Sequence, residues 1–493
     1  MIGDERSRLL GSASVGRPDL WIALLIAIHL VPIWIVERYP SQDGASHLFQ
    51  AWALHGYASS ELLREHFVLN LTPFPNWGCY ALLQPLLAFA APATAEKLLL
   101  TLYVVAFPLS YFWLLDSVHP GRRLSGFVVF AFVFNYSLQL GLYSFCLGVP
   151  LCFYVLGSWW RHRDALGGGK ALALGGLLVL TYLAQVDTVF LTLAALGILA
   201  LVTARRANFA SRLRLCVAVL PVCALLVWYL FGQQLTPSPS FEPTGRIAYL
   251  VNQDWLVSTA GQRIVGWLIT GLLGVLAIVT VRARLRPGAC KLVPADAFVV
   301  VSTVLLLGIM VLPNNTMSGG LLIPRISLFT VPLLLVALAP ALVGGPRRAL
   351  IVALVTIVAL QWGMTVSYVL RASRDLEEFV SGLPVIERKG LIWPVTGRSR
   401  PLDTVSNLSP IVHAGNWYAI ESGGVNVVNY HATSANFPVL ERRKFDPQNP
   451  PAGSLYLIAW DPLEGPGSPL PDLPGYDRVF VSTLGHLRIF RRR

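Results

Sequence analysis

Long apolar runs separated by short basic clusters constrain this chain more than any other feature of its sequence. The runs recur from position 20 to position 370, and most are long enough for a helix that crosses a hydrocarbon layer about 30 Å thick. Only 13% of the residues are charged, and the mean hydropathy is +0.60. A soluble domain carries about twice that share of charged residues. The sequence therefore predicts an all-α polytopic membrane protein.

The basic residues predict its topology. They cluster between alternate pairs of apolar runs, whereas the short turns near 139, 186 and 317 contain none. By the positive-inside rule, residues 1–19 are cytoplasmic, and the net charge of +12 reflects topology and not a nucleic-acid partner. About 11 transmembrane helices are expected within 20–370, at 20–36, 96–115, 124–138, 142–160, 170–185, 188–203, 213–232, 263–281, 297–313, 321–343 and 347–370. The protein should therefore be a multi-pass protein of the cell (inner) membrane.

The apolar stretch 77–92 is not counted as a span. The basic segment 119–123 should be cytoplasmic and the polar segment 39–48 should lie outside, so an odd number of crossings must separate them. Since 77–92 is also short for a crossing, we expect interfacial helices within an outer loop, 37–95.

Residues 371–493 differ from the rest of the chain in composition. They are polar and rich in Pro and Gly, with a helix-like stretch at 373–383 and short β-like runs at 391–395, 454–460 and 479–482. This pattern predicts a small α/β domain, which the predicted topology makes extracytoplasmic.

The segment 39–48 carries the first candidate site, directly after the first span. Asp43 and His47 are four residues apart, so their side chains share one face if the segment is helical. Gly44 would let the backbone approach a substrate closely. The alternative is that Ser41 and Asp43 simply begin a helix, a position that both residue types favour.

A first span followed by a long outer loop that opens on an acidic motif resembles the GT-C superfamily. These are integral-membrane glycosyltransferases, among them protein mannosyltransferases and the aminoarabinose transferase of lipid A, and some carry a soluble outer C-terminal domain. The resemblance implies a polyprenyl-phosphate-linked sugar donor and a lipid, glycan or protein acceptor. In the family an Asp or Glu opening this loop acts as base or binds a metal, and Asp43 is the matching position.

One feature departs from the family pattern. Several relatives have paired acidic residues in this loop, whereas here Asp43 is followed by Gly44, and the six cysteines show no zinc-binding spacing. A divalent metal is therefore possible but not favoured, no cofactor is certain, and no metal ligand is assigned. We expect Asp43, with His47 beside it, to act as the catalytic base.

The leaving lipid phosphate needs a cation near it. Arg325 is the first candidate, because it lies at the outer end of a long span, against the positive-inside bias; the alternative is that it reaches outer headgroups. Arg246 and Arg263 flank the outer loop 233–262 and are second candidates. Asp187, at the tip of a helical hairpin, is expected to hold the acceptor, to assist Asp43, or merely to cap a helix.

Two further sets of residues are candidates for sugar contacts. Asn135 and Tyr136 lie in an outer turn with Tyr143 nearby, although interface anchoring is the commoner role of Tyr. A polar-aromatic cluster in 371–493 suits carbohydrate stacking or an ordinary domain core; it contains His413, Trp417, Tyr418, Asn429, Tyr430 and His431.

Two other functions fit a polytopic chain. A transporter or flippase of a lipid-linked glycan would need polar residues in the centres of several spans, which are almost free of charge here. An outer-leaflet glycan polymerase or ligase usually has its long outer loop late in the chain, whereas the long loop here follows the first span.

Overall fold

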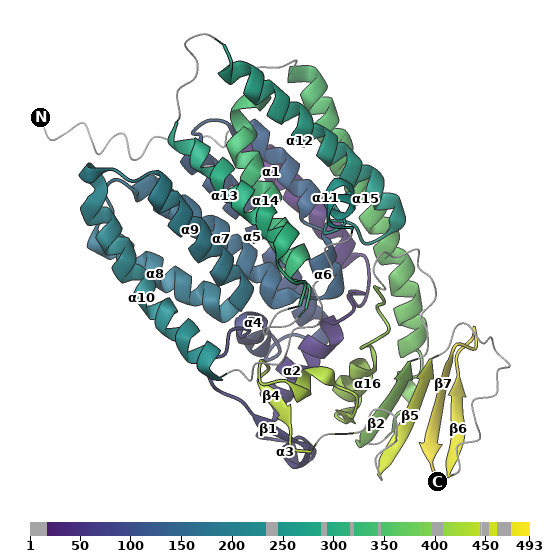
Figure 1. Cartoon of the computed structure of the whole chain (residues 1–493). Helices are drawn as coiled ribbons and strands as arrows, with labels where there is room; N and C mark the ends of the chain where they lie inside the picture. Colours follow the sequence, from purple (N-terminus) through teal and green to yellow (C-terminus); the bar gives the residue numbers. More distant parts are fainter. Residues whose placement is uncertain are drawn as a thin grey trace, which may run out of the picture.

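A computed structural model describes residues 17–232, 245–286, 293–315, 320–343, 347–387, 389–396, 408–443, 445, 453–460 and 475–493. The described chain is mostly helical, with a bundle of long helices and a small sheet at one end (Figure 1). The α-helices are α1 (Arg17–Trp34), α2 (Gly44–Gly56), α3 (Glu61–His66), α4 (Gly78–Leu86), α5 (Pro92–Val118), α6 (Tyr136–Leu140), α7 (Tyr143–His162), α8 (Gly168–Ala184), α9 (Val186–Val202), α10 (Phe209–Gly232), α11 (Arg246–Asn252), α12 (Arg263–Arg284), α13 (Ala297–Val311), α14 (Leu322–Leu338), α15 (Arg347–Val380) and α16 (Gly415–Ser422).

Several 3-10 segments connect or extend these helices. The longest, η1 (Arg123–Phe132), leads toward α6 within one apolar stretch. The others are η2 (Arg206–Asn208), η3 (Ala260–Gln262), η4 (Pro294–Asp296), η5 (Ala339–Val343), η6 (Leu383–Val385) and η7 (Tyr430–Thr433).

Among the described residues, eight helical stretches are long and apolar enough to cross a membrane. They are Pro92–Val118, Arg123–Leu140, Tyr143–His162, Arg206–Gly232, Ala260–Arg284, Pro294–Val311, Leu322–Ala341 and Arg348–Val385. Three shorter apolar helices, Pro18–Trp34, Gly168–Ala184 and Val186–Val202, coincide with three other expected spans. The prediction of a helical membrane protein is confirmed, whereas the number of about 11 spans stays a prediction.

The apolar stretch 77–92 contains the short helix α4. Its nine residues span about 14 Å at 1.5 Å per residue, too little to cross a bilayer. The helix packs against α2, α5 and α7 at the end of the bundle that carries the sheet. This placement agrees with the expectation of a helix that does not cross the membrane.

A proline in α1 explains one contact inside the bundle. Pro32 has no amide proton, so the carbonyl of Ile28 lacks the donor that a regular helix would supply. The indole of Trp362, on α15, donates to that carbonyl at 3.0 Å. The contact attaches α1 to α15 and satisfies a backbone group that would otherwise be costly in an apolar environment.

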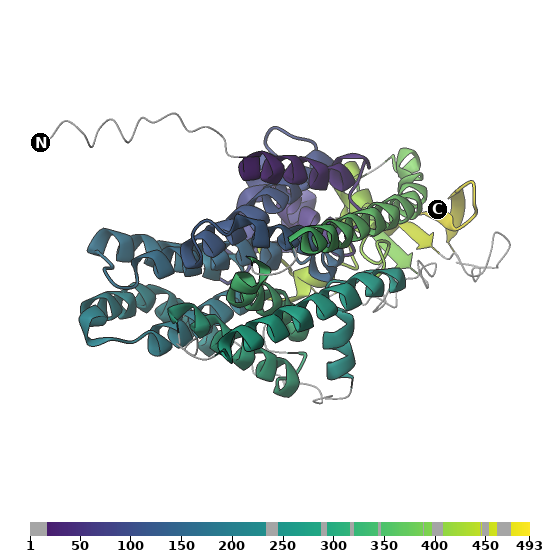
Figure 2. The ribbon, with the colours of Figure 1, turned by 90° about the horizontal axis from the view of Figure 1, so that it is seen from above.

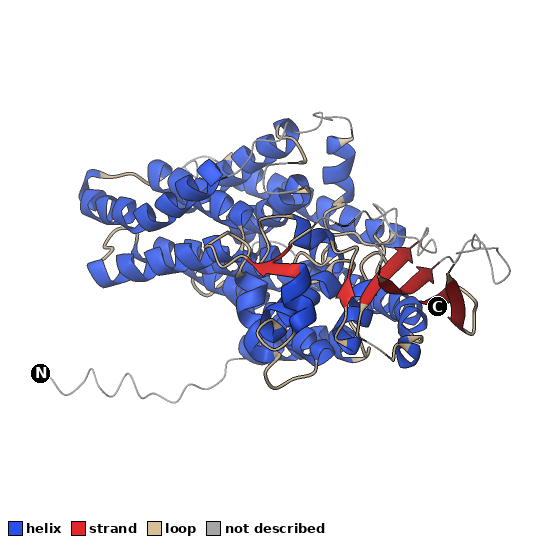
Figure 3. Ribbon diagram, turned by 90° about the horizontal axis from the view of Figure 1, so that it is seen from below, coloured by secondary structure: helices blue, strands red, loops and turns tan. Residues whose placement is uncertain are grey.

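The C-terminal region forms a five-stranded sheet in the order β3-β2-β5-β7-β6. β2 runs parallel to β3 and β5, whereas β7 is antiparallel to β5 and β6. These strands are β2 (Leu391–Thr396), β3 (Val425–Asn426), β5 (Ser454–Trp460), β6 (Tyr476–Val481) and β7 (Leu487–Arg492). Figures 2 and 3 show from opposite sides that the strands gather at one end of the bundle (Figure 2, Figure 3). The predicted small C-terminal sheet is thereby confirmed.

Helix α15 connects the bundle with this sheet without a break. It continues past position 370, where the sequence analysis ended the last span, and Phe379 near its end packs against Trp460 of β5. Tyr418 of α16 packs edge-on against the same phenylalanine. The buried core of the sheet region is therefore built in part by the last helix of the bundle.

A second, two-stranded sheet joins the predicted outer loop to the C-terminal region. β1 (Phe67–Leu69), in the predicted outer loop, pairs antiparallel with β4 (Val439–Glu441). The buried side chain of Gln50, on α2, forms two hydrogen bonds with the backbone of Val439 on β4. The side-chain amide of Gln50 donates to the Val439 carbonyl at 3.0 Å, and the side-chain oxygen of Gln50 accepts from the Val439 N–H at 2.9 Å. The segment around 439 is thus fixed to the loop that follows the first helix, although the sequence analysis treated 371–493 as a separate unit.

Candidate functional site

Asp43 lies in the turn between α1 and α2 and is fixed there by its backbone. Its N–H donates to the carbonyl of Leu140 at 2.8 Å, and the N–H of Gln42 donates to that of Gln139 at 3.1 Å. Asp43 occupies the N-cap position of α2, but its side chain makes no capping hydrogen bond. The carboxylate is therefore available for other contacts, so capping does not explain this residue.

Gly44 is needed for packing behind the site. A Cβ atom at this position would clash with the side chains of Ser41, Glu96 and Tyr143. The Tyr143 hydroxyl donates to the Glu96 carboxylate at 2.6 Å and lies 2.6 Å from the Ser41 hydroxyl. From the sequence, Gly44 is expected to let the backbone approach a substrate closely, whereas the structure places it against this buried polar group and outside the cavity lining.

The carboxylate of Asp43 faces side chains from the C-terminal region. The Tyr430 hydroxyl donates to Oδ2 at 2.9 Å, and Nε2 of His413 lies 3.5 Å from Oδ1. Burial raises the pKa of Asp43 to about 6, against the opposing effect of hydrogen bonds from Tyr430 and Gln42. A carboxylate with this pKa is mostly ionised at neutral pH and can take a proton from a reacting hydroxyl.

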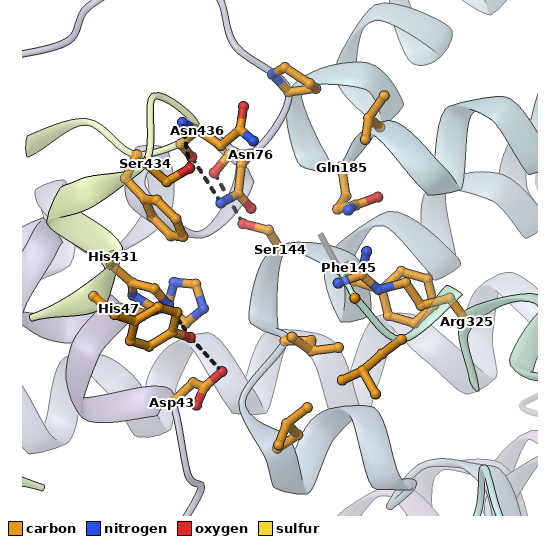
Figure 4. Close-up of a pocket in the computed structure, with 18 of the residues that line it drawn as sticks. Asp43, His47, Asn76, Ser144, Phe145, Gln185, Arg325, His431, Ser434 and Asn436 are labelled. Carbon is orange, nitrogen blue, oxygen red and sulfur yellow. Dashed lines mark hydrogen bonds between the residues drawn. The ribbon is translucent and has the colours of Figure 1, made fainter. Parts of the chain in front are cut away.

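A cavity of about 360 Å³ opens in front of Asp43. Asp43, His47 and His431 lie on one side of it, and Arg325, Phe145 and Gln185 lie on the other (Figure 4). The remaining described residues of its lining are Pro75, Asn76, Leu140, Leu142, Ser144, Val186, Tyr229, Gly320, Leu321, Tyr430, Thr433, Ser434, Asn436 and Phe437. The cavity thus combines a carboxylate, a guanidinium, neutral hydrogen-bonding groups and an apolar surface.

Arg325 projects from the second turn of α14 and is 7% exposed. Its guanidinium forms an ion pair with the carboxylate of Asp187, to which Gln185 also donates at 3.0 Å. The Arg325 Nε is buried and has no hydrogen-bond partner among the described residues. An arginine buried in this way does not reach for headgroups, and its side chain contributes to the lining of the cavity.

Asp187 begins α9 but does not cap it. The side chain of Gln185 accepts hydrogen bonds from the N–H groups of Asp187 and Thr188 and so provides the cap. Asp187 is buried and serves as the anion opposite Arg325. It is not part of the cavity lining, so it orients the arginine and does not contact a molecule in the cavity directly.

His47 lines the cavity but does not touch the Asp43 carboxylate. Its Nδ1 lies 2.6 Å from the Tyr80 hydroxyl, and its ring packs 4.5 Å from that of His431. Burial lowers the pKa of His47 to about 3, so the imidazole is neutral at physiological pH. Asp43 and His47, which were predicted to share one face of a helix, both line the cavity. Their side chains have different hydrogen-bond partners.

Three other candidates lie outside the cavity lining. Arg246 is buried and donates to backbone carbonyls at the end of α13, one of them Leu312 at 3.0 Å. Asn135 caps α6 and donates to the Tyr103 hydroxyl at 3.0 Å. Tyr136 is buried near Asp43, and its backbone N–H donates to the carbonyl of Trp255. The contacts of Arg246 and Asn135 hold helix ends in place, and these candidates do not form a substrate-binding wall.

Several residues of the lining were not singled out from the sequence. Asn76, Ser144, Tyr229 and Asn436 carry no motif and come from four distant segments. Within the polar-aromatic cluster of 371–493, Tyr430 and His431 do reach the site, whereas Trp417 and Tyr418 are fully buried in the core. The adjacent tyrosine and histidine were a usable signal, but nothing in the sequence connects them with Asp43.

The described residues contain no group of three or more His, Cys, Asp or Glu side chains arranged to hold a metal ion. A comparison of the sequence with models of known protein families found no match, and a comparison with curated proteins found none either.

Proposed function

We propose that this chain is a membrane glycosyltransferase that moves a sugar from a polyprenyl-phosphate-linked donor to an acceptor, with Asp43 as general base. One observation carries the proposal. A single cavity has an aspartate with a pKa near 6 on one wall and a buried arginine on the other. The carboxylate can accept the proton that the acceptor loses, and the arginine can stabilise the negative charge that develops on the leaving phosphate.

The proposed reaction is a single displacement. The acceptor hydroxyl or amine gives its proton to the Asp43 carboxylate while its oxygen or nitrogen forms a bond to the anomeric carbon. The bond between that carbon and the phosphate oxygen breaks, and its electron pair leaves with the lipid phosphate. Arg325 stabilises the negative charge that develops on the phosphate. The product has inverted stereochemistry at the anomeric carbon.

The composition of the cavity wall supports a lipid-linked donor. Apolar side chains line part of the cavity, among them Val186, Leu321 and Phe145, the last of which lies on the arginine side. Val186 lies on α9 and Leu321 directly precedes α14, two of the apolar helices of the bundle. A phosphate held at Arg325 would therefore leave its polyprenyl chain next to apolar surface, as burial of hydrocarbon requires.

The wider proposal is that the chain is a GT-C-type enzyme of the cell (inner) membrane. Its N-terminus would be cytoplasmic, and the cavity and the C-terminal sheet would lie on the outer side. The turn before α2 supports this proposal, because it presents Asp43 at the start of the long loop after the first helix. The acceptor is a lipid, a glycan or a protein.

The test is transfer by the purified protein in proteoliposomes. The donors are polyprenyl phosphates carrying different radiolabelled sugars, and the acceptors are lipid extracts and oligosaccharides. We expect Asp43→Asn to lower transfer by at least about 100-fold, the usual contribution of a general base, while the variant still inserts and folds. Asp477→Asn is the matched control, because Asp477 is exposed on β6 and pairs with Arg493.

Two outcomes would contradict the proposal. In one, the Asp43→Asn protein transfers sugar as fast as the unchanged protein. In the other, intact lipid-linked sugar crosses the bilayer with no transfer, which would identify the chain as a flippase. A fluorescent donor that can be quenched from one side of the vesicle measures that movement in the same preparation.

A further inference from the structure

The segment that begins with η7 carries two side chains across the Asp43 carboxylate. The side chain of Asn429 accepts from the backbone N–H of His431 at 3.2 Å and so starts the short helix. Further along, Val439 is held by Gln50 and by the pairing of β4 with β1. Both ends of the segment are therefore fixed, and Tyr430 between them has a defined position over the site.

A directed chain of hydrogen bonds runs from His431 to Asp43. Nε2 of His431 lies 2.6 Å from the Tyr430 hydroxyl, and that hydroxyl lies 2.9 Å from Oδ2 of Asp43. An ionised carboxylate can only accept a hydrogen bond, so the contact with Oδ2 uses the hydroxyl proton of Tyr430. The short contact between Tyr430 and the neutral imidazole is then a hydrogen bond only if His431 carries its proton on Nε2 and donates it to the Tyr430 oxygen. The single hydroxyl proton of Tyr430 is then directed at the carboxylate.

We propose that Tyr430, oriented by His431, is a positioning residue that keeps Asp43 ionised and turns its Oδ1 toward the acceptor; this inference rests on the proposed function of Asp43 as base. Oδ2 is engaged by the short bond from Tyr430. Oδ1 has only long contacts among the described residues, with His413 at 3.5 Å and Gln42 at 3.4 Å. Oδ1 is thus the oxygen with room for an incoming proton.

The other groups around Asp43 do not replace this donor. Burial lowers the pKa of His413 to about 4 and that of His47 to about 3, so both rings are neutral near pH 7. The tyrosines near the Asp43 carboxylate are uncharged near pH 7. Arg325 lies on the opposite side of the cavity. The titratable groups facing Asp43 are His47, Tyr80, Tyr136, His413, Tyr430 and His431.

Through Tyr430, the C-terminal region takes part in the proposed chemistry. A domain that only binds carbohydrate would offer its polar and aromatic residues to the solvent. Here Tyr430 is 43% exposed, but its hydroxyl donates to the Asp43 carboxylate. Deleting this one oxygen should therefore alter the base itself and not merely the affinity for a sugar.

The experiment titrates the Asp43 carboxyl directly by infrared spectroscopy in proteoliposomes. The carbonyl band of the protonated acid is assigned as the band that Asp43→Asn removes. We expect a midpoint near pH 6 in the unchanged protein. In Tyr430→Phe the midpoint should lie about one pH unit higher, the effect of losing one hydrogen bond to a carboxylate. Tyr57→Phe is the control, since its hydroxyl donates to a backbone carbonyl at 3.1 Å outside the cavity lining.

The outcomes separate this inference from the proposed function. An unchanged midpoint in Tyr430→Phe overturns the inference whether or not the protein transfers sugar. A raised midpoint in a protein that transfers no sugar supports the coupling of Tyr430 to Asp43 and contradicts the glycosyltransferase proposal. When transfer is observed, the acidic limb of its pH profile should move upward with the infrared midpoint, which a purely structural role of Tyr430 would not produce.

Discussion

Arg325 and Asp187 form a buried ion pair that connects α14 with α9 beside the cavity. Arg325 also lines the cavity, whereas Asp187 is not part of the lining. Breaking such a pair on one side is costly because the remaining charge stays buried. The arrangement therefore makes separate predictions for stability and for activity.

Arg325→Gln should lower kcat/KM for the lipid-linked donor by about 100-fold, since the leaving phosphate loses its charge partner. The same change should destabilise the protein by about 3 kcal/mol, because the buried carboxylate of Asp187 loses its ion pair with Arg325. Thermal unfolding in detergent and donor kinetics measure the two effects. The double variant Arg325→Gln/Asp187→Asn should regain stability but not activity. Recovery of both would assign the arginine a purely structural role.

Transfer should depend on pH through Asp43. The pKa of this group is raised to about 6 by burial, and only the ionised form accepts a proton. The rate should therefore be constant well above pH 6 and fall about tenfold per pH unit well below it. Measurement of kcat/KM between pH 4.5 and 8 tests this. An acidic limb of the pH profile with its midpoint near pH 4, close to the ordinary pKa of an aspartate, would show that the Asp43 carboxyl is not buried as described.

Gly44→Ala should destabilise the turn before α2. The added methyl group meets Ser41, Glu96 and Tyr143, and overpacking of this kind costs about 1–3 kcal/mol. Transfer should fall as well, because the turn carries Asp43. The control is Gly363→Ala on α15, where a Cβ has nothing within 4 Å. Equal melting temperatures for the two variants would contradict the close packing behind the site.

Gln50→Leu should loosen the segment around β4. The change removes two buried hydrogen bonds to the backbone of Val439, at a cost of about 1 kcal/mol each. Hydrogen exchange read by mass spectrometry should show faster exchange in peptides covering 429–443, with α7 as the unaffected reference. Unchanged protection of 429–443 would mean that the β1–β4 pairing alone holds the segment.

The helical bundle was predictable because each span is specified by its own apolar run, which is local information. The short helix α4 was also predictable, since parity and length both excluded 77–92 as a crossing. The contact of Tyr430 with Asp43 was not. It depends on a pairing of three-residue strands at 67–69 and 439–441, too short to produce an alternating pattern that sequence inspection can detect.

The arginines show a second limit of the sequence. Arg325 and Arg246 carry the same signal, a cation near the predicted outer end of a span. Arg325 pairs with Asp187 beside the cavity, whereas Arg246 donates hydrogen bonds to backbone carbonyls at the end of α13. Every residue has a backbone carbonyl, so a sequence cannot show which arginine will donate its hydrogen bonds to carbonyl groups. The placement of partners in space decides it.

The pairing of β1 with β4 also sets an order of events during synthesis. Asp43 leaves the ribosome early, and the apolar helices of the bundle follow it before Tyr430 is made. A chain interrupted between positions 380 and 430 would contain the long helices of the bundle but would have an open strand edge at β1 and a carboxylate without its tyrosine. The contact between Tyr430 and Asp43 can therefore form only after nearly all of the chain has been synthesised.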